Sequence, residues 1–149
     1  MAETTAMDPQ GEVFNFAQYL LDRNTGHAAR LAYVDDLRDL RYGELAHQVQ
    51  AVAAALQAAS VRREERVFLL MHDCIDWPCT FLGAMYCGSV PVAVNTLLKP
   101  EDYAYMLAKS RSQLAVVSQA LMTTRATSGI CDSVRLCTRC WHTRHWCHK

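Results

Sequence analysis

Four side chains near the carboxyl end of the chain are of the types that bind zinc. Cys137 and Cys140 form a Cys-x-x-Cys pair, and His142 and His145 form a His-x-x-His pair. Structural zinc sites separate their two ligand pairs by about a dozen residues or more, so that the backbone can fold both pairs around one ion. Here only Trp141 lies between the pairs. We therefore expect no dedicated metal site, and a small zinc-binding regulator that works through these four residues stays as an alternative.

Three polar side chains follow the first strongly apolar run of the chain. His72, Asp73 and Asp76 come directly after Val67–Met71, and the carboxyl ends of parallel strands are where the active sites of open sheets gather. No nucleophile with a matching base is present beside them. We expect these residues to have structural roles, as helix caps and as solvent-exposed polar groups, with Asp76 as the N-terminal cap of the next helix.

Two further segments could contact a phosphate-bearing ligand. Residues 95–99 (Asn-Thr-Leu-Leu-Lys) offer an amide, a hydroxyl and an ammonium group, but Asn and Thr in such loops usually bond to their own backbone. Thr123–Gly129 is rich in hydroxyls, yet it has one glycine and no lysine after it, unlike a phosphate-binding loop. The sequence therefore predicts no catalytic, cofactor-binding or metal-binding residue in this chain.

The elements that position these residues begin with a polar leader at residues 1–12, which we expect to be flexible. Apolar residues at near-helical spacing predict a short amphipathic helix from Phe14 to Leu21 that stops at residues 24–26. Residues 31–42 contain two apolar runs around Asp35-Asp36, which predict a small hairpin at the edge of a sheet. A helix over residues 42–59 follows, and its apolar positions share one face: Leu45, Val49, Val52, Ala53 and Leu56.

From residue 67 the chain alternates strands and helices. Residues 67–71, 90–94 and 114–118 are apolar runs without polar alternation, as in parallel strands buried on both faces. Helices are predicted between them, from Asp76 to a stop at Gly88 and again from Pro100, where two acids suit the positive end of the helix dipole. We predict an α/β fold with a parallel, doubly wound sheet.

Composition narrows the classes of partner and compartment. Fifteen basic and fifteen acidic residues give no net charge, so no global field attracts nucleic acid or an anionic membrane. We expect no secretory signal at the start, because acid stands where such a signal carries base. Cys74, Cys79 and Cys87 do not have the spacing of a disulfide framework. The uncharged stretch from Trp77 to Val94 is interrupted by Gly-Ser-Val-Pro. We predict a cytoplasmic protein with no membrane span.

The order of segments resembles a known family, the adenylate-forming acyl- and aryl-CoA synthetases, and is most similar to its benzoate and 4-hydroxybenzoate branch. The resemblance runs from about Phe14 to Met122. The family's early Leu-x-Tyr-x-Glu-Leu element is matched by residues 40–45, and the helix, glycine and Val-Pro-Val combination by residues 81–92. The benzoate branch is favoured by Val-Asn-Thr-Leu-Leu at residues 94–98 and Asp-Tyr-Ala-Tyr at residues 102–105.

This resemblance implies a fold and a reaction. The chain would be the start of the large N-terminal domain of an adenylate-forming enzyme, with residues 13–122 as an incomplete α/β domain of the AMP-binding type. The family converts a carboxylate and ATP to an acyl-adenylate and pyrophosphate, and coenzyme A then displaces AMP; Mg²⁺ offsets the phosphate charge. The family's phosphate loop, acid pocket, ribose-binding Asp and catalytic Lys match no position here. We therefore expect a chain that binds no cofactor alone and is inactive.

Composition changes abruptly after about Arg125. Residues 126–149 contain four of the seven cysteines, two of the three tryptophans and a net charge of +3. A frameshift in a GC-rich gene explains this change, because leucine codons read one base late yield Trp and Cys. We expect residues 123–149 to lie outside the family and to be disordered.

Together these features predict the N-terminal fragment of an ATP-dependent aromatic acid–CoA ligase whose substrate is an aromatic carboxylate such as benzoate. A non-enzymatic α/β binding or assembly module is the main alternative. Apolar surface left exposed by an incomplete domain favours self-association in either case.

Overall fold

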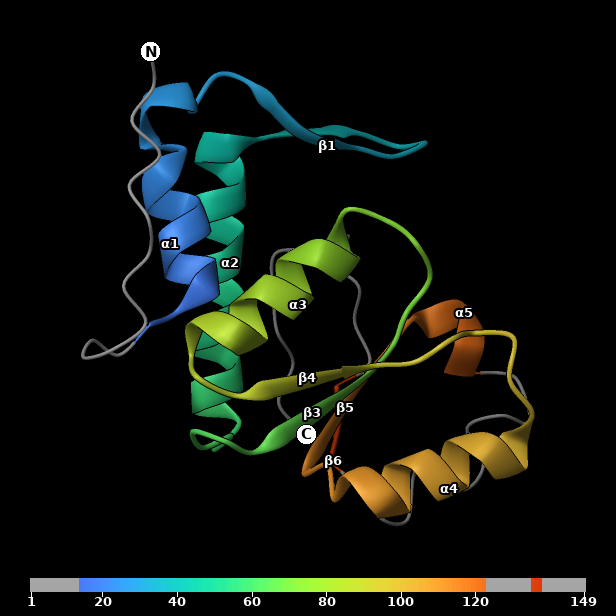
Figure 1. Cartoon of the computed structure of the whole chain (residues 1–149). Helices are drawn as coiled ribbons and strands as arrows, with labels where there is room; N and C mark the ends of the chain where they lie inside the picture. The colour runs from blue at the N-terminus through green and yellow to red at the C-terminus, as the bar shows by residue number, and fades with distance from the viewer. Residues whose placement is uncertain (1–13, 123–134, 138–149) are drawn as a thin grey trace.

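The computed structural model describes residues 14–122 and the backbone of residues 135–137. The described elements, in chain order, are α1 (Phe16–Arg23), η1 (Thr25–His27), β1 (Leu31–Val34), β2 (Asp39–Arg41), α2 (Tyr42–Ala58), β3 (Arg66–Leu70), α3 (Asp76–Tyr86), β4 (Val90–Ala93), α4 (Pro100–Ser110), β5 (Leu114–Val117), α5 (Gln119–Met122) and β6 (Arg135–Cys137). Figure 1 shows α2 and α3 on one side of the main sheet and α4 on the other.

The main sheet is parallel and has the strand order β4-β3-β5-β6. The chain leaves β3 through α3 to reach β4, and it returns past β3 through α4 to reach β5. Helices on opposite faces and a reversal of direction beside β3 make this a doubly wound arrangement. The predicted α/β fold class and the alternation of strands and helices are confirmed.

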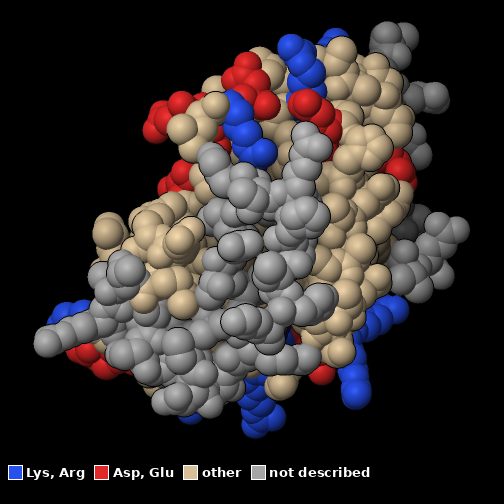
Figure 2. Space-filling view, turned by 180° about the vertical axis from the view of Figure 1, so that it is seen from behind, with Lys and Arg blue, Asp and Glu red and all other residues tan. Residues whose placement is uncertain are grey.

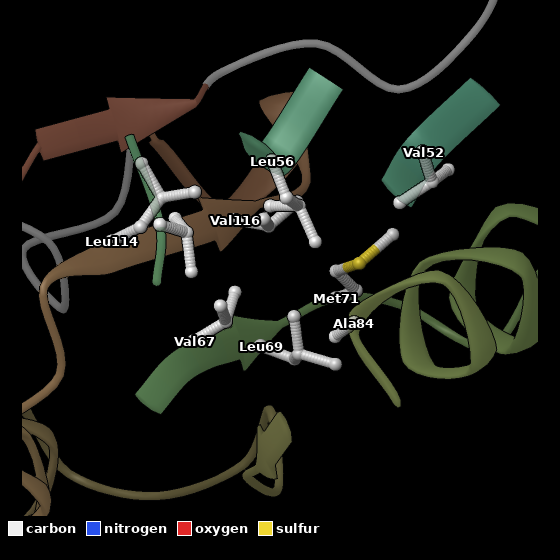
Figure 3. Packing of buried hydrophobic residues seen from close by; sticks show 9 residues of the cluster. Val52, Leu56, Val67, Leu69, Met71, Ala84, Leu114 and Val116 are labelled. Carbon is white, nitrogen blue, oxygen red and sulfur yellow. The ribbon is translucent and has the colours of Figure 1, made fainter. Parts of the chain in front are cut away.

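Strand β3 divides the core into two layers because its side chains alternate between the faces of the sheet. Val67 and Leu69, with Met71 directly after the strand, pack toward α2 and α3, as Figure 3 shows. Phe68 and Leu70 pack on the other face, against α4. Continuous apolarity in this strand is therefore explained by burial on both sides, as the sequence predicts.

Helix α2 buries the five residues that its periodicity predicts, Leu45, Val49, Val52, Ala53 and Leu56. Helix α1 differs from its prediction. Ala17 and Leu21 are buried, but Phe14 and Phe16 are 53% and 44% exposed, and the helix begins at Phe16. Its N-cap Asn15 accepts the backbone N–H of Gln18 and donates its own amide to the carbonyl of Met85 at 2.8 Å, which joins the start of α1 to the end of α3.

Two strand predictions are wrong in position. The β1–β2 hairpin forms a separate two-stranded antiparallel sheet and does not edge the main one. Strand β4, predicted to be buried, is half exposed, because it is the edge strand of the described sheet. The backbone N–H groups of Val90 and Val94 point to β3, so the nitrogen of Pro91 faces outward and offers no donor to another strand.

Strand β6 is a further difference. The sequence predicts no structure for residues 123–149, whereas Arg135–Cys137 pairs in parallel with Leu114–Val116 of β5. Three residues are too few for hydrophobic periodicity to reveal a strand. The remaining residues from 123 to 149, and the leader at residues 1–12, lie outside the described part of the chain, so the expectations for them stay predictions.

Charge is mixed on the one face that Figure 2 shows, where described residues are visible. On the face in Figure 2, basic and acidic side chains are interspersed and do not form a large patch of one sign. Within the described residues, no helix is both long enough and apolar enough to cross a membrane. The uncharged stretch from Trp77 to Val94 is divided between α3 and β4.

Candidate functional site

The carboxyl ends of β3 and β5 lie side by side and are joined through Ser118. The backbone N–H of Ser118 donates to the carbonyl of Leu70 at 3.0 Å, and its hydroxyl accepts the backbone N–H of His72 at 3.0 Å. The side chains of His72 and Asp73 are exposed just beyond this junction. In doubly wound sheets ligands bind at this edge, where the direction of the strand order reverses, so we treat it as the candidate site.

Helix α3 begins at this edge, and its start is bound by the hairpin. The predicted role of Asp76 as N-cap is wrong: Asp76 is the first residue of α3, and Ile75 is the capping position. The carboxylate of Asp76 is almost fully buried and pairs with Arg38. The backbone N–H of Ile75 instead donates to Asp35 Oδ2 at 2.9 Å. An acceptor from the distant hairpin thus binds the N–H of the residue before the helix, whereas a side-chain cap would accept an N–H of the first turn.

A pocket of about 370 Å³ lies between the hairpin and α3. Its walls combine aromatic and aliphatic side chains with three carboxylates, and they are Tyr33, Val34, Asp35, Asp36, Asp73, Cys74, Ile75, Trp77 and Pro78. This volume is within the range of small-molecule sites. No glycine lies between residues 44 and 82, so the turn after β3 cannot bring its backbone close to a phosphate as a glycine-rich loop does.

The Asn95–Lys99 segment is a connecting loop. As the sequence predicts, the side chain of Asn95 bonds to the loop's own backbone. Asn95 Oδ1 accepts the backbone N–H of Leu97 at 2.8 Å. The hydroxyl of Tyr103, on α4, donates to the carbonyl of Asn95 at 2.9 Å and accepts the N–H of Leu98 at 3.1 Å. The loop is therefore held by its own asparagine and by a tyrosine whose side chain reaches back from the next helix.

Replacing Tyr103 by phenylalanine tests how much this bridge contributes. Tyr103 is 1% exposed, so two backbone groups lose a partner that water replaces only in part. We expect Tyr103→Phe to lower the free energy of unfolding by about 1 kcal/mol, measured by urea denaturation. The matched control Tyr105→Phe removes a hydroxyl from a 64% exposed ring on the same helix and should leave stability unchanged. Equal effects of the two substitutions would contradict the bridge.

Cysteine chemistry is disfavoured at Cys79. Burial, and after it the neighbouring charge of Asp76, raise the pKa of its thiol to about 12. The thiol donates to Gln48 Oε1 at 3.2 Å. Because the thiolate is the nucleophilic form, Cys79 is a packing residue at neutral pH.

The zinc-type residues of the sequence are not brought together by the part of the chain that the structure describes. The backbone of Cys137 lies in β6, and Cys140, His142 and His145 lie outside the described residues, as does Thr123–Gly129. Among residues 14–122, no three His, Cys, Asp or Glu side chains are grouped so that they could hold a metal ion.

Comparison with known proteins shows which enzymes this chain is similar to. Residues 20–142 match the family model described as AMP-binding enzyme, so the match extends beyond Met122 and includes β6. The chain is 42% identical over 114 residues to benzoate–CoA ligase of Thauera aromatica and 37% identical over 111 residues to 4-hydroxybenzoate–CoA/benzoate–CoA ligase of Rhodopseudomonas palustris. These alignments cover 74% and 73% of this chain but only 22% and 21% of the relatives. The chain thus spans about a fifth of the length of these ligases.

Solved structures of aromatic acid–CoA ligases have the same fold over most of this chain. A benzoate CoA ligase from Burkholderia xenovorans LB400 superimposes with a TM-score of 0.78 at 40% identity, over 85% of this chain and 25% of that one. An anthranilate CoA ligase, solved with anthranoyl-AMP, gives a TM-score of 0.77 at 28% identity with the same coverage. The fold described above is therefore that of the N-terminal portion of such enzymes.

Proposed function

The chain belongs to the AMP-binding enzyme family, and we propose that it is the N-terminal scaffold of an ATP-dependent aromatic acid–CoA ligase. The observation that carries this proposal is the 42% identity to a benzoate–CoA ligase over three quarters of the chain. A long-chain fatty-acid ligase from Mycobacterium tuberculosis is only 30% identical. An aromatic carboxylate such as benzoate is the substrate class that this difference favours.

The reaction would consume benzoate, ATP and coenzyme A and release benzoyl-CoA, AMP and pyrophosphate. Among the described residues, no strand end offers a glycine-rich loop, a paired nucleophile and base, or a metal-binding group of carboxylates. We therefore assign ATP, Mg²⁺ and coenzyme A to residues that the relatives carry in the four fifths of their length that this chain does not span. The role of the chain is to form the doubly wound core that supports them.

The proposal predicts that the chain alone is inactive. The purified chain is mixed with ATP, Mg²⁺, coenzyme A and benzoate, and AMP release is compared with a reaction that lacks the acid. We expect no difference, although circular dichroism should show a folded α/β protein. Acid-dependent turnover that persists after removal of any contaminating full-length ligase would contradict the proposal.

A complementation experiment tests the scaffold role directly and uses the ligase with 42% identity. The part of the Thauera aromatica ligase that this chain does not align with is expressed separately and added to the chain. Benzoyl-CoA formation that depends on both pieces supports the scaffold role. No turnover with this mixture, when the ligase's own N-terminal piece does restore it, counts against that role.

One observation favours the second candidate, a non-enzymatic assembly module. Large apolar side chains are exposed on the hairpin, namely Leu31, Tyr33, Val34 and Leu37, and such patches mark interaction sites. The outward nitrogen of Pro91 counts against assembly through the β4 edge. Dependence of turnover on both pieces, in the mixture described above, separates a scaffold from a module with a partner of another kind.

A further inference from the structure

Two contacts join the tip of the hairpin to the start of α3. Asp35 lies in the turn between β1 and β2, and its Oδ2 accepts the N–H of Ile75, 40 residues away, at 2.9 Å. Arg38, on the other side of the same turn, pairs with Asp76. The hairpin shares no strand pairing with the main sheet among the described residues. Leu40 of β2 is buried in the cluster that also holds Ile75 and Cys79, and the two polar contacts add to this packing at the tip.

The two oxygens of Asp35 have different tasks. Oδ1 accepts the backbone N–H groups of Leu37 and Arg38, each at 2.9 Å, and so fixes the turn of the hairpin itself. Within the described part of the chain, Oδ2 accepts a hydrogen bond from the start of α3. Ile75 has no polar side chain, and the first N–H groups of a helix need acceptors from outside the helix. The carboxylate therefore joins a locally determined turn to the start of α3.

The pocket of about 370 Å³ depends on this junction. One wall comes from the hairpin, with Tyr33 and Val34, and the opposite wall comes from α3 and the loop before it, with Ile75 and Trp77. If the hairpin moved away from α3, the pocket would lose one wall, while β3, β4 and β5 would keep their pairing.

We propose that Asp35 is a latch: by supplying an acceptor to the start of α3 it closes the hairpin over the carboxyl edge of the sheet, and its release opens the pocket without unfolding the main sheet. This device belongs to the conformational behaviour of the chain and does not require that the chain be part of a ligase.

The latch is closed at neutral pH. The N–H of Ile75 is the largest of the influences that hold the pKa of Asp35 below its usual value of 3.8, followed by the N–H of Leu37. The charged groups around it are Arg38 on the hairpin, Asp76 on α3, and Asp36 and Asp73 on the pocket wall. Because the folded-state pKa is lowered, the stabilisation is complete above pH 3.8 and is lost as the pH falls through the folded-state pKa.

The test is the substitution Asp35→Asn. An asparagine can keep the Oδ1 contacts of the turn, but its NH₂ group cannot accept the N–H of Ile75. We expect the Ile75 amide to exchange with solvent deuterium about tenfold faster in this variant, while amides of β3 keep their wild-type rates. Asp36→Asn is the matched control, because it removes a neighbouring charge of the same pocket wall, and it should leave Ile75 unchanged.

Three outcomes overturn the proposal. Equal exchange of Ile75 in Asp35→Asn and the wild type would show that the contact does not protect the helix start. Faster exchange throughout β3 and α2 would show that Asp35 stabilises the whole domain and not a local latch.

A pH titration of the wild type gives a second test that does not depend on how the variant folds. The Ile75 amide shift should follow the Asp35 titration below pH 3.8, and titration of Asp35 at its ordinary pKa would also refute the latch.

Discussion

Replacing Gly83 by alanine is expected to lower the free energy of unfolding by about 3 kcal/mol. A β-carbon at this position would lie 2.5 Å from Cγ1 of Val52, 2.6 Å from its Cβ and 3.1 Å from the carbonyl of Val49. The nearest atoms belong to a branched side chain that is completely buried and to a helix backbone, so neither can move away alone. Helices α2 and α3 must separate to admit a single methyl group.

The sign of this effect is informative because the local preference is opposite. In an isolated helix, alanine is favoured over glycine by about 1 kcal/mol, so a loss of stability has to come from the contact between the helices. Urea denaturation followed by circular dichroism measures it. Gly26→Ala is the control, since nothing lies within 4 Å of a β-carbon at Gly26.

A second substitution locates the clash. Val52→Ala alone removes buried methyl groups and should destabilise the protein. Combined with Gly83→Ala it removes the 2.5 Å contact with Cγ1 but leaves the Cβ of residue 52 at 2.6 Å from the new β-carbon, so the double variant should recover part of the loss and be somewhat more stable than the sum of the two single effects predicts. Strict additivity, or a Gly83→Ala variant as stable as the wild type, would contradict the close approach of α2 and α3.

The fold of this chain is predictable from its sequence where the pattern of apolar residues extends over several positions, either at helical spacing or as a continuous run. The apolar face of α2 and the continuous runs of β3 and β5 each repeat a pattern over several residues, and the structure confirms them. The Val90–Ala93 run is also apolar, but β4 is half exposed. Strand order decides burial in that case, and the sign of it within the four residues is Pro91, which lacks a donor for a neighbouring strand.

The candidate site is less predictable because its contacts join distant segments. The position of Asp76 before an apolar helix is typical of a cap, yet an acceptor for the start of α3 comes from Asp35, 40 residues earlier. The only sequence signal for this contact is the Asp35-Asp36 turn itself, which indicates a hairpin and not its docking place. Gly83 is similar: a glycine inside a helix costs local stability, and that cost is the one sign that a neighbour needs the space.

Replacing Phe68 by alanine is expected to have the largest effect, a loss of about 4 kcal/mol in the free energy of unfolding. The ring is fully buried on the α4 face of β3, in contact with a cluster that includes Tyr103 and Leu107. Tyr105→Ala is the control, because that ring on α4 is 64% exposed and its removal should change stability by less than about 0.5 kcal/mol.

The same variant tests whether the two layers of the core are distinct. Leu69, the next residue, faces α2 and α3 on the opposite side of the sheet, so Phe68→Ala and Leu69→Ala damage different layers of one strand. Amide exchange under native conditions should rise first in α4 for Phe68→Ala and first in α3 for Leu69→Ala. If both substitutions accelerate exchange in the same helices, the layers unfold together, and the doubly wound core acts as one cooperative unit. Distinct patterns would mean that the α4 layer can loosen while the α2–α3 layer, with the latched hairpin, stays folded.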